Sequence, residues 1–209
     1  MFLLSACGGS DPIGYIPPPQ PPTPPTSPTA PTPLPTFDAD GVLEANIRWT
    51  DFGVPHITAD NLESMSFGVG YAFAKDNMCI LADQIVRYNS ERAKYFGPDA
   101  VPGSGDAAHL INDFVFLTVG IRQLAEDNFT RLSENTRAMM SGYTQGFNQY
   151  MSDTPVADQD PRCAGQPWLQ PIDEIDILTY SLGISLLPGA ANFLPAMFAA
   201  APPGESFLP

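Results

Sequence analysis

The stretch that decides the fold runs Ile47-Arg48-Trp49-Thr50-Asp51-Phe52-Gly53-Val54-Pro55-His56-Ile57-Thr58-Ala59. Together with Ala45, it places apolar side chains at every second position up to Trp49, which is the period of a β-strand. Asp51-Phe52-Gly53 predicts a turn, and residues 54–58 predict a return strand. Because proline has no N–H to donate to a neighbouring strand, Pro55 belongs at a sheet edge or a strand start. The stretch therefore predicts a short β-hairpin.

Helices are predicted for the rest of the body. Asp60-Asn61-Leu62-Glu63 is similar to a capping box, so a helix should begin there. Its small residues, which would let another backbone pack closely, are Gly68, Gly70, Ala72 and Ala74. Five further segments predict helices: about 77–96, 110–117, 121–129, 133–151 and 173–201. Gly97-Pro98 should end the first of these, and Ser133 should cap the fourth.

The first 36 residues differ from the rest in composition. Half of the 24 prolines lie there, and Asp11 carries the only charge. Such a segment cannot bury enough apolar surface to fold, and it predicts an extended spacer. We divide the chain into a lipoprotein signal remnant (1–7), a disordered Pro/Thr-rich linker (8–36), a folded domain (37–204) and the start of a truncated linker peptide (205–209).

Leu4-Ser5-Ala6-Cys7 resembles a bacterial lipobox, in which small residues before a cysteine allow cleavage and lipid attachment to the thiol. This interpretation makes Cys7 the lipidation site and predicts a periplasmic protein. Gly8 after the cysteine favours an anchor in the outer membrane. Because no basic segment precedes the short apolar stretch, we expect the natural start to lie upstream. The alternative is a chance match.

Composition argues against several functions. The net charge is −14 and the isoelectric point is near 4.1. Binding to nucleic acid is therefore not expected, because phosphates call for clustered Lys and Arg. The three cysteines form no Cys-x-x-Cys pair, so they carry no zinc or thioredoxin signature. We expect no cofactor and no metal.

Residue types alone reveal no catalytic group. The two histidines are His56 and His109, and the sequence has no His-Glu-x-x-His motif or Gly-rich phosphate loop. His56 in the return strand fits a hydrogen-bonded structural role better than that of a base. Asp173, Glu174 and Asp176 fit a helix N-terminus, where carboxylates are favoured, better than a metal site.

Short sequence motifs are more informative about function than residue types. The hairpin stretch resembles the segment that opens the α subunit of the penicillin acylase family of N-terminal-nucleophile amidohydrolases. Residues 68–77 resemble the helix that follows in that family, and the match continues through residues 88–97, 142–148 and 163–169. The resemblance covers about residues 44–204. Within the family, the motifs are most similar to those of the acyl-homoserine-lactone and aculeacin acylase branch.

The resemblance implies both a fold and a function. The fold would be α+β and mostly helical, with residues 37–204 as the α-subunit part of an αββα assembly. The family's precursor cuts itself and frees a serine at the start of a β subunit, whose own α-amino group acts as the base. The α subunit contributes apolar walls to the acyl pocket. The substrate would be an N-acyl compound, such as an acyl-homoserine lactone, a lipopeptide or a β-lactam side chain, cut to an acid and an amine.

The chemical centre of the family is not found in this sequence. The family's nucleophilic serine follows glycine and precedes asparagine, whereas Ser206 follows Glu205 and precedes Phe207. We therefore expect no catalytic residue here, a β subunit of the same precursor as partner, and no activity of this chain alone.

The end of the last helical segment is expected to face the acyl group. A loose local match with the family places four residues near the acyl pocket: Leu186, Leu187, Asn192 and Phe193. Pro188 and Pro195 each lack a helical N–H, so the helix should kink between them into a concave wall. Ordinary core packing is the alternative. Residues 198–201 offer no carboxylate where penicillin-type members bind calcium, so no calcium is expected.

Two cysteines remain if Cys7 carries a lipid. In an oxidising compartment Cys79 and Cys163 are expected to form a disulfide. Two buried free thiols are the alternative.

Two other interpretations remain open. A catalytically dead surface lipoprotein or truncated relic would act only as a binding module, through its acidic helical body. Residues 177–201 carry no charge and are long enough to cross a bilayer. Two features argue against a membrane span: the prolines Pro188 and Pro195, and the absence of flanking Lys or Arg. Both favour a buried, broken helix instead.

Overall fold

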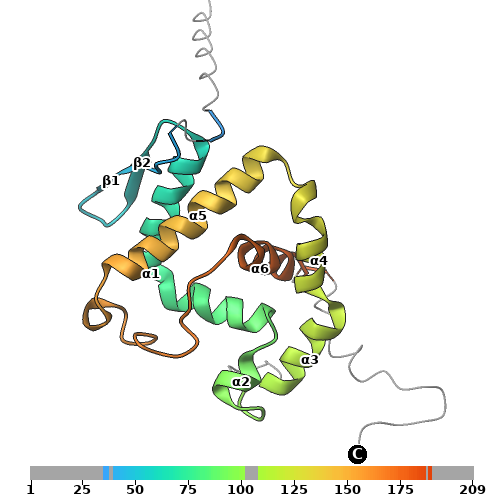
Figure 1. Cartoon of the computed structure of the whole chain (residues 1–209). Coiled ribbons are helices and arrows are strands. Elements are labelled where there is room, and N and C mark those ends of the chain that lie inside the picture. The colour runs from blue at the N-terminus through green and yellow to red at the C-terminus, as the bar shows by residue number, and fades with distance from the viewer. Residues whose placement is uncertain (1–34, 38–39, 102–107, 187, 190–209) are drawn as a thin grey trace, which may run out of the picture. The chain divides into compact units, whose positions relative to one another are not determined.

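The computed structural model describes residues 35–37, 40–101, 108–186 and 188–189, all within one compact unit, Leu34–Pro209 (Figure 1). The elements follow in the order β1 (Asn46–Trp49), β2 (Pro55–Thr58), α1 (Leu62–Tyr88), α2 (Arg92–Phe96), α3 (His109–Val119), α4 (Ile121–Asn128), η1 (Phe129–Arg131), α5 (Glu134–Asp153), η2 (Val156–Asp158) and α6 (Glu174–Leu186). Helices predominate, and the strands of the described residues form one two-stranded sheet. The predicted class, mostly helical with a short hairpin near the N-terminus, is confirmed.

The hairpin packs one of its faces on α1. Ile47 pairs with Ile57 across the antiparallel ladder, and Gly53 turns the chain at φ +76°, a conformation that favours glycine. Ile47, Trp49 and Ile57 alternate with exposed neighbours and are half-buried. At Gly68 of α1, a Cβ atom would lie 2.7 Å from Ile57 Cγ2. The helix can approach the hairpin this closely because that position has no side chain.

His56 lies on the other face of the hairpin. It stands opposite Arg48 in the ladder, and both side chains are exposed. The alternation that half-buries Ile57 turns its neighbour His56 towards solvent. His56 thus lies in the predicted return strand with its side chain exposed, and its hydrogen-bonded structural role stays a prediction.

Side-chain and backbone acceptors begin α1. Asn61 Oδ1 accepts a hydrogen bond from the N–H of Ser64 at 2.7 Å, as the capping sequence predicts. The first two N–H groups of the helix donate to the carbonyl oxygens of Pro35 and Thr36 at 2.8 and 3.1 Å. These last residues of the segment assigned to the linker thus supply acceptors that the first turn of a helix lacks.

α1 is one long helix where the sequence predicts two. The boundary expected near residue 77 is a kink, because Asn77 has a non-helical φ of −134° and ψ of 17°. The helix ends at Tyr88, and Ser90 takes a left-handed φ of 60°, which breaks the helical path. α2 then starts separately and stops before Gly97. The predicted continuous helix from 77 to 96 is therefore wrong.

Glycines bring α1 and α5 into backbone contact. A Cβ atom on Gly70 would lie 2.0 Å from the carbonyl oxygen of Tyr143, and one on Gly146 would lie 1.9 Å from that of Phe67. Figure 1 shows α5 lying across α1. The expected close approach of another backbone to the small residues of α1 is confirmed, and the partner is α5.

The buried apolar residues form two clusters. The larger joins α1, α5 and the segment after α5 through Ala74, Met78, Cys79, Leu81, Ile85, Phe147, Cys163 and Ile172. The smaller joins α1, α3, α4 and α6 through Tyr88, Phe116, Ile121, Tyr180, Leu182 and Leu186. The smaller cluster positions the end of α6.

The remaining helices lie close to their predicted ranges. Gly120, at φ +69°, separates α3 from α4, and Ser133 Oγ caps α5 by accepting from the N–H of Thr136 at 3.2 Å. The predicted continuation of α6 to residue 201, with its kink, falls outside the described residues. No helix of the described part has the length and apolar character needed to span a membrane.

Candidate functional site

The structure describes one of the four predicted pocket residues. Leu186 is the last residue of α6 and lies half-buried against the smaller cluster. Four other predicted functional positions lie outside the described residues: Cys7, Leu187, Asn192 and Phe193. The described part of the site is therefore the group of side chains against which the end of α6 packs. Tyr88, Phe116 and Tyr180 form this group, here called the floor.

That floor is aromatic. The ring centre of Tyr88 lies 4.9 Å from that of Phe116 and 6.0 Å from that of Tyr180. α6 meets the Tyr88 ring at Gly183, where a Cβ atom would lie 2.2 Å from the ring carbon Cδ1. Burial raises the pKa of the Tyr88 phenol, so the group stays neutral at physiological pH. The floor next to Leu186 is thus built from neutral aromatic groups, and the Arg87 guanidinium lies over the Tyr88 and Phe116 rings, 5.9 and 6.0 Å from their centres.

A hollow of about 240 Å³ opens beside the floor. Tyr88, Phe116 and Leu117 form its apolar side, while Arg122 and Glu126 stand on its polar side. Pockets that enclose a drug-sized ligand usually measure about 300–1,000 Å³. This hollow can therefore hold only part of a ligand, or a side chain of a partner protein.

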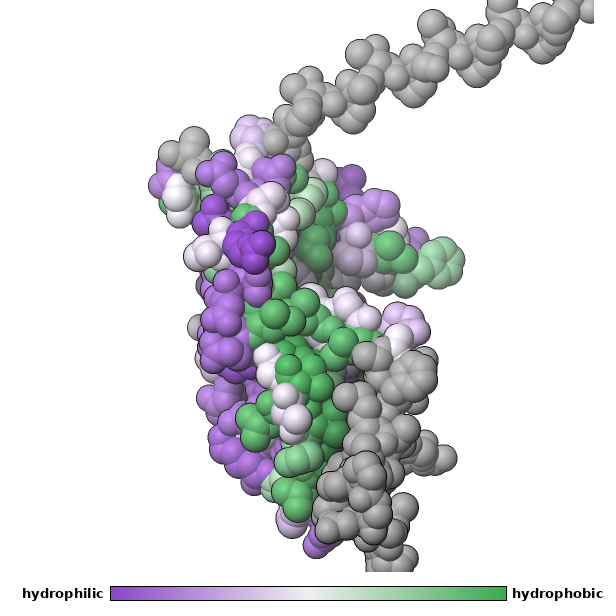
Figure 2. Space-filling model, turned by 90° about the vertical axis from the view of Figure 1, so that its right-hand side faces the viewer, coloured by the Kyte–Doolittle hydropathy of each residue, from purple (hydrophilic) through white to green (hydrophobic). Residues whose placement is uncertain are grey.

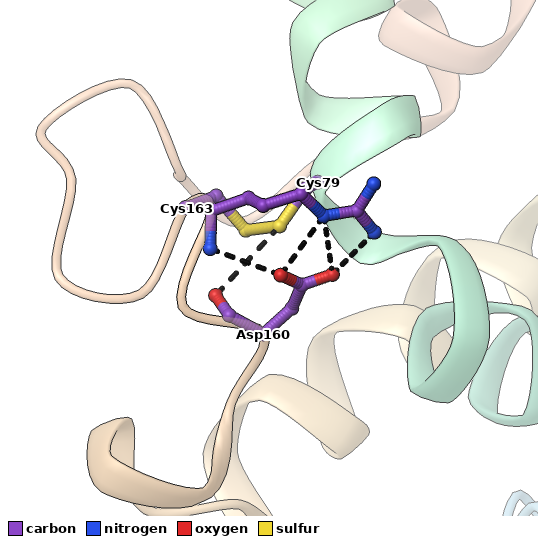
Figure 3. Close-up of a disulfide and its surroundings, with 4 residues drawn as sticks. Cys79, Asp160 and Cys163 are labelled. Carbon is purple, nitrogen blue, oxygen red and sulfur yellow. Dashed lines mark hydrogen bonds and ion pairs between the residues drawn. A yellow bond between two sulfur atoms is a disulfide. The ribbon is translucent and has the colours of Figure 1, made fainter.

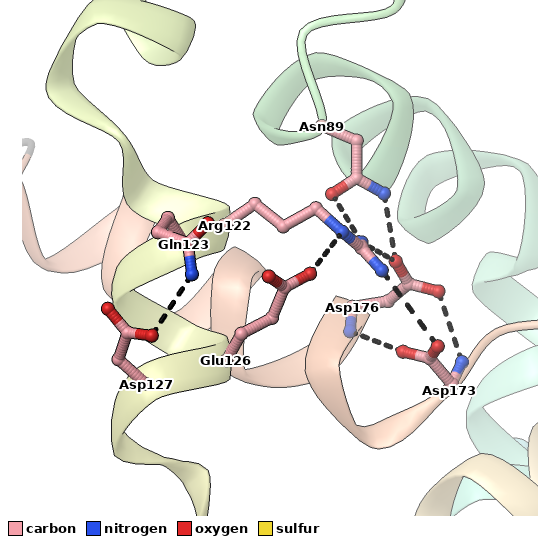
Figure 4. A network of polar contacts seen from close by, with 7 residues as sticks. All are labelled: Asn89, Arg122, Gln123, Glu126, Asp127, Asp173 and Asp176. Atoms are coloured by element: carbon pink, nitrogen blue, oxygen red, sulfur yellow. Dashed lines mark hydrogen bonds and ion pairs between the residues drawn. The ribbon is translucent and has the colours of Figure 1, made fainter.

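Arg122 of α4 links three helices on the polar side of the hollow (Figure 4). Its Nη1 donates to Asp176 Oδ1 at 2.8 Å and to Asn89 Oδ1 at 3.0 Å, and its Nε lies 3.2 Å from a Glu126 oxygen. Burial lowers the pKa of Arg122, but the hydrogen bond and the charge of Asp176 reverse this, and the pKa is raised. The guanidinium is thus a structural cation, and Asp176 is occupied rather than poised as a base.

The acidic start of α6 combines a helix cap with this ion pair. Asp173 Oδ1 accepts from the N–H of Asp176 at 2.8 Å, as predicted for carboxylates at a helix N-terminus. The pairing of Asp176 with Arg122 joins residues 54 positions apart, which no local sequence pattern indicates. Among the described residues, no group of three or more His, Cys, Asp or Glu side chains is placed to hold a metal ion.

A cavity of about 310 Å³ lies next to the same network. Ile85 and Ile172 supply apolar wall, and Trp168 and Tyr95 supply aromatic wall. Its polar end is the Arg122 network, whose members already bond to one another. The residues that line this cavity do not indicate a particular class of ligand.

A buried ionic cluster fixes α2 and α3. The Arg92 side chain is 7% exposed, and its two Nη atoms donate to the two oxygens of Asp83 at 2.9 and 2.8 Å. Arg92 Nε donates to His109 Nδ1 at 3.2 Å. Asp113 accepts from the backbone N–H groups of Arg92 and Ala93 at 3.0 and 2.7 Å. Buried charges are tolerated when they are paired in this way, and His109 serves as a structural acceptor.

Cys79 and Cys163 form a disulfide, the pairing that the sequence predicts, with Cα atoms 5.4 Å apart (Figure 3). It ties the irregular segment after α5 to α1, and both cysteines are buried. Beside it, the guanidinium and the backbone N–H of Arg162 donate to Asp160, which lowers the pKa of that carboxyl. The disulfide is structural and lies in the larger core cluster.

Apolar side chains gather on the side of the molecule formed by α3 and α4. Figure 2 is viewed from the side on which these helices lie in Figure 1, and hydrophobic residues form a band there. The exposed apolar residues of the two helices are Leu110 (57%), Phe114 (56%), Leu117 (72%), Val119 (42%) and Leu124 (50%). A patch of this kind marks an interaction surface.

The described residues thus offer walls for binding. Aromatic groups make the floor under Leu186, and the charged groups of the Arg122 network beside it are paired with one another. An arrangement of this kind can position an apolar group or a partner protein.

The comparisons identify one family. Residues 44–192 match the family model described as penicillin amidase. The chain is 33% identical to the acyl-homoserine lactone acylase PvdQ of Pseudomonas syringae pv. syringae over 161 residues, or 77% of this chain and 20% of that protein. It is 35% identical to the aculeacin-A acylase of Actinoplanes utahensis over 169 residues, or 78% of this chain and 21% of that protein. The chain thus spans about a fifth of the length of these relatives.

A solved structure shares the fold. The thermostable penicillin G acylase from Alcaligenes faecalis superposes with a TM-score of 0.58 at 16% identity, over 80% of this chain and 98% of the compared chain. The ordered match of the hairpin, the glycine-rich part of α1 and the later motifs is therefore explained by common descent, and the chain belongs to the penicillin amidase family.

Proposed function

We propose that this chain is the α-subunit part of an acylase that hydrolyses the amide bond of an N-acyl substrate. Its family and its relatives support an amidohydrolase. The observation that carries the proposal is the apolar floor of Tyr88, Phe116 and Tyr180 under Leu186. The floor stands at the end of the helix from which the resemblance expects the acyl pocket to be built.

The proposal divides the work between two parts. A β part supplies the serine nucleophile, its α-amino base and the oxyanion donors, as the resemblance implies. This chain supplies pocket wall, from Leu186 and, beyond the described residues, from the apolar Leu187 and Phe193 and the polar Asn192. A floor of aromatic rings favours a fatty or aromatic acyl group, because a charged acyl group would lose its hydration on contact with the rings.

The proposal is tested by co-expressing the chain with the β part encoded with it. We expect one complex with one copy of each, measured by light scattering after size exclusion. We also expect the chain alone to bind a hydrophobic dye strongly, because the patch on α3 and α4 is exposed, and the complex to bind much less of it. Failure of the two parts to co-purify, with a chain that stays soluble and dye-free alone, would favour a separate binding module.

A further inference from the structure

Gly183 is a buried glycine inside α6. It is not among the described glycines with a positive φ, so its backbone conformation does not require glycine. Inside a helix, alanine is more favourable than glycine. The requirement comes from the Tyr88 ring, because a Cβ atom on Gly183 would lie 2.2 Å from its Cδ1, 2.4 Å from its Cε1 and 2.7 Å from its Cγ. The missing side chain therefore lets α6 lie directly on Tyr88.

The Tyr88 ring is held so that it cannot turn aside. Tyr88 is 2% exposed. The Phe116 ring meets it edge-on with the centres 4.9 Å apart, the Tyr180 ring centre lies 6.0 Å away, and the Arg87 guanidinium lies 5.9 Å from its centre. A side chain at position 183 would therefore be accommodated by movement of α6 rather than of the ring. Because carbon atoms pack at about 3.5–4.0 Å, the helix and the ring would separate by more than about 1 Å.

The same contact fixes the position of Leu186 on the floor. Leu186 lies three residues after Gly183, so the two positions share one side of the helix. Leu186 ends α6 and packs against the cluster that contains Tyr88 and Phe116. Movement of α6 away from the Tyr88 ring would therefore lift Leu186 from the floor, towards the side on which the acyl group is expected.

We propose that Gly183 is a positioning residue that sets the depth of the acyl pocket, an inference that rests on the proposed function. It acts through Leu186. The contact of Gly183 with the Tyr88 ring keeps Leu186 on the floor and leaves room for a long acyl chain on the other side of that leucine. A methyl group at position 183 would raise Leu186 by more than about 1 Å, which is comparable to the length that one methylene adds to an extended chain. The close approach of α6 to Tyr88 thus determines the longest acyl group that the enzyme accepts.

The test measures acyl-chain preference in the complex of this chain with its β part. The substrates are N-acyl-homoserine lactones with straight chains from butanoyl to tetradecanoyl, and kcat/KM is measured for each. Since one methylene in an apolar pocket changes kcat/KM by about 10–200-fold, Gly183→Ala should lower kcat/KM for the longest chain that the wild type accepts by at least about tenfold. For the shortest chains we expect less than about twofold change. An equal loss for all chains would show a general effect on folding or assembly and would overturn the proposal.

Two further variants make the test reciprocal. Tyr88→Leu removes the ring from the other side of the contact and should shift the preference towards longer chains. The double variant, Gly183→Ala with Tyr88→Leu, should return the preference towards that of the wild type, because the two changes act at one contact. The matched control is Ser181→Thr, which adds one carbon atom on the exposed side of the same helix. It should change the ratio of kcat/KM between long and short chains by less than about twofold.

The outcomes separate this proposal from the proposed function. If the wild-type complex releases no free acid from any substrate, both fail. If the wild type is active and Gly183→Ala keeps its preference, or shifts it towards longer chains, the positioning role alone is wrong. An unchanged preference in Tyr88→Leu likewise overturns the positioning role, and this result does not depend on the folding of Gly183→Ala.

Discussion

Gly146→Val should prevent the chain from folding, and Gly146→Ala should cost at least about 3 kcal/mol of its free energy of unfolding. A Cβ atom at this position would lie 1.9 Å from the carbonyl oxygen of Phe67 and 2.8 Å from its carbon. The obstructing atoms are backbone atoms of α1, so no side-chain rotation relieves the clash. The two helices must separate, and the larger core cluster packed beside their crossing would lose contact. Circular dichroism during thermal and urea unfolding measures the loss.

The matched control for this prediction is Gly189→Ala, because a Cβ atom there meets nothing within 4 Å. We expect its stability to stay within about 0.5 kcal/mol of that of the wild type. A Gly146→Val chain that unfolds at the same urea concentration as the wild type would show that α1 and α5 do not cross at backbone contact.

Removal of the disulfide should be the next most damaging change. Replacing both Cys79 and Cys163 by Ala opens a loop with a sequence separation of 84. The chain-entropy model gives up to about 4–5 kcal/mol for a loop of this size. The double variant avoids an unpaired thiol, and its loss of stability is measured as the change in the urea midpoint. Reductant should lower the midpoint of the wild type by a similar amount and leave that of the variant unchanged.

The thiols offer an independent check on the disulfide. The chain is prepared from an oxidising compartment, denatured without reductant and treated with a maleimide. Modification of both Cys79 and Cys163 would contradict the disulfide, and the stability difference would then need another cause.

Local patterns predict the start of the fold well. The period of two before Trp49, the turn at Gly53 and the cap at Asn61 each act over a few residues, so the sequence reveals them directly. The contact of α1 with α5 also follows from its small residues, although only the structure shows that Gly146 provides the opposite surface.

The features that the sequence does not predict are those determined by contacts between residues far apart in the chain. A break at Ser90 and the capture of the N–H of Arg92 by Asp113 divide the helix expected from 77 to 96, and Asp113 lies 21 residues away. The Arg122–Asp176 pair and the Asp83–Arg92–His109 cluster are likewise made by tertiary packing. The exposed position of His56 is likewise not evident from the sequence, because the face of a strand that meets α1 is known only once the hairpin is placed on the helix.

The candidate site is predictable to a smaller degree. Leu186 was expected from the resemblance, and the structure places it on the apolar floor. The floor itself was missed, because Tyr88, Phe116 and Tyr180 come from three helices. Only Gly183 gives a local signal, since a glycine inside a helix often marks close packing against another group.

The central claim is that this chain completes an acylase whose chemical groups lie in a β part. The most direct measurement is the release of free acid from a series of N-acyl-homoserine lactones by the chain alone, by the β part alone and by their complex. We expect release by the complex only, because the chain contributes binding wall and the β part contributes the nucleophile. Release by the purified chain alone that is abolished by Ser206→Ala would contradict the account.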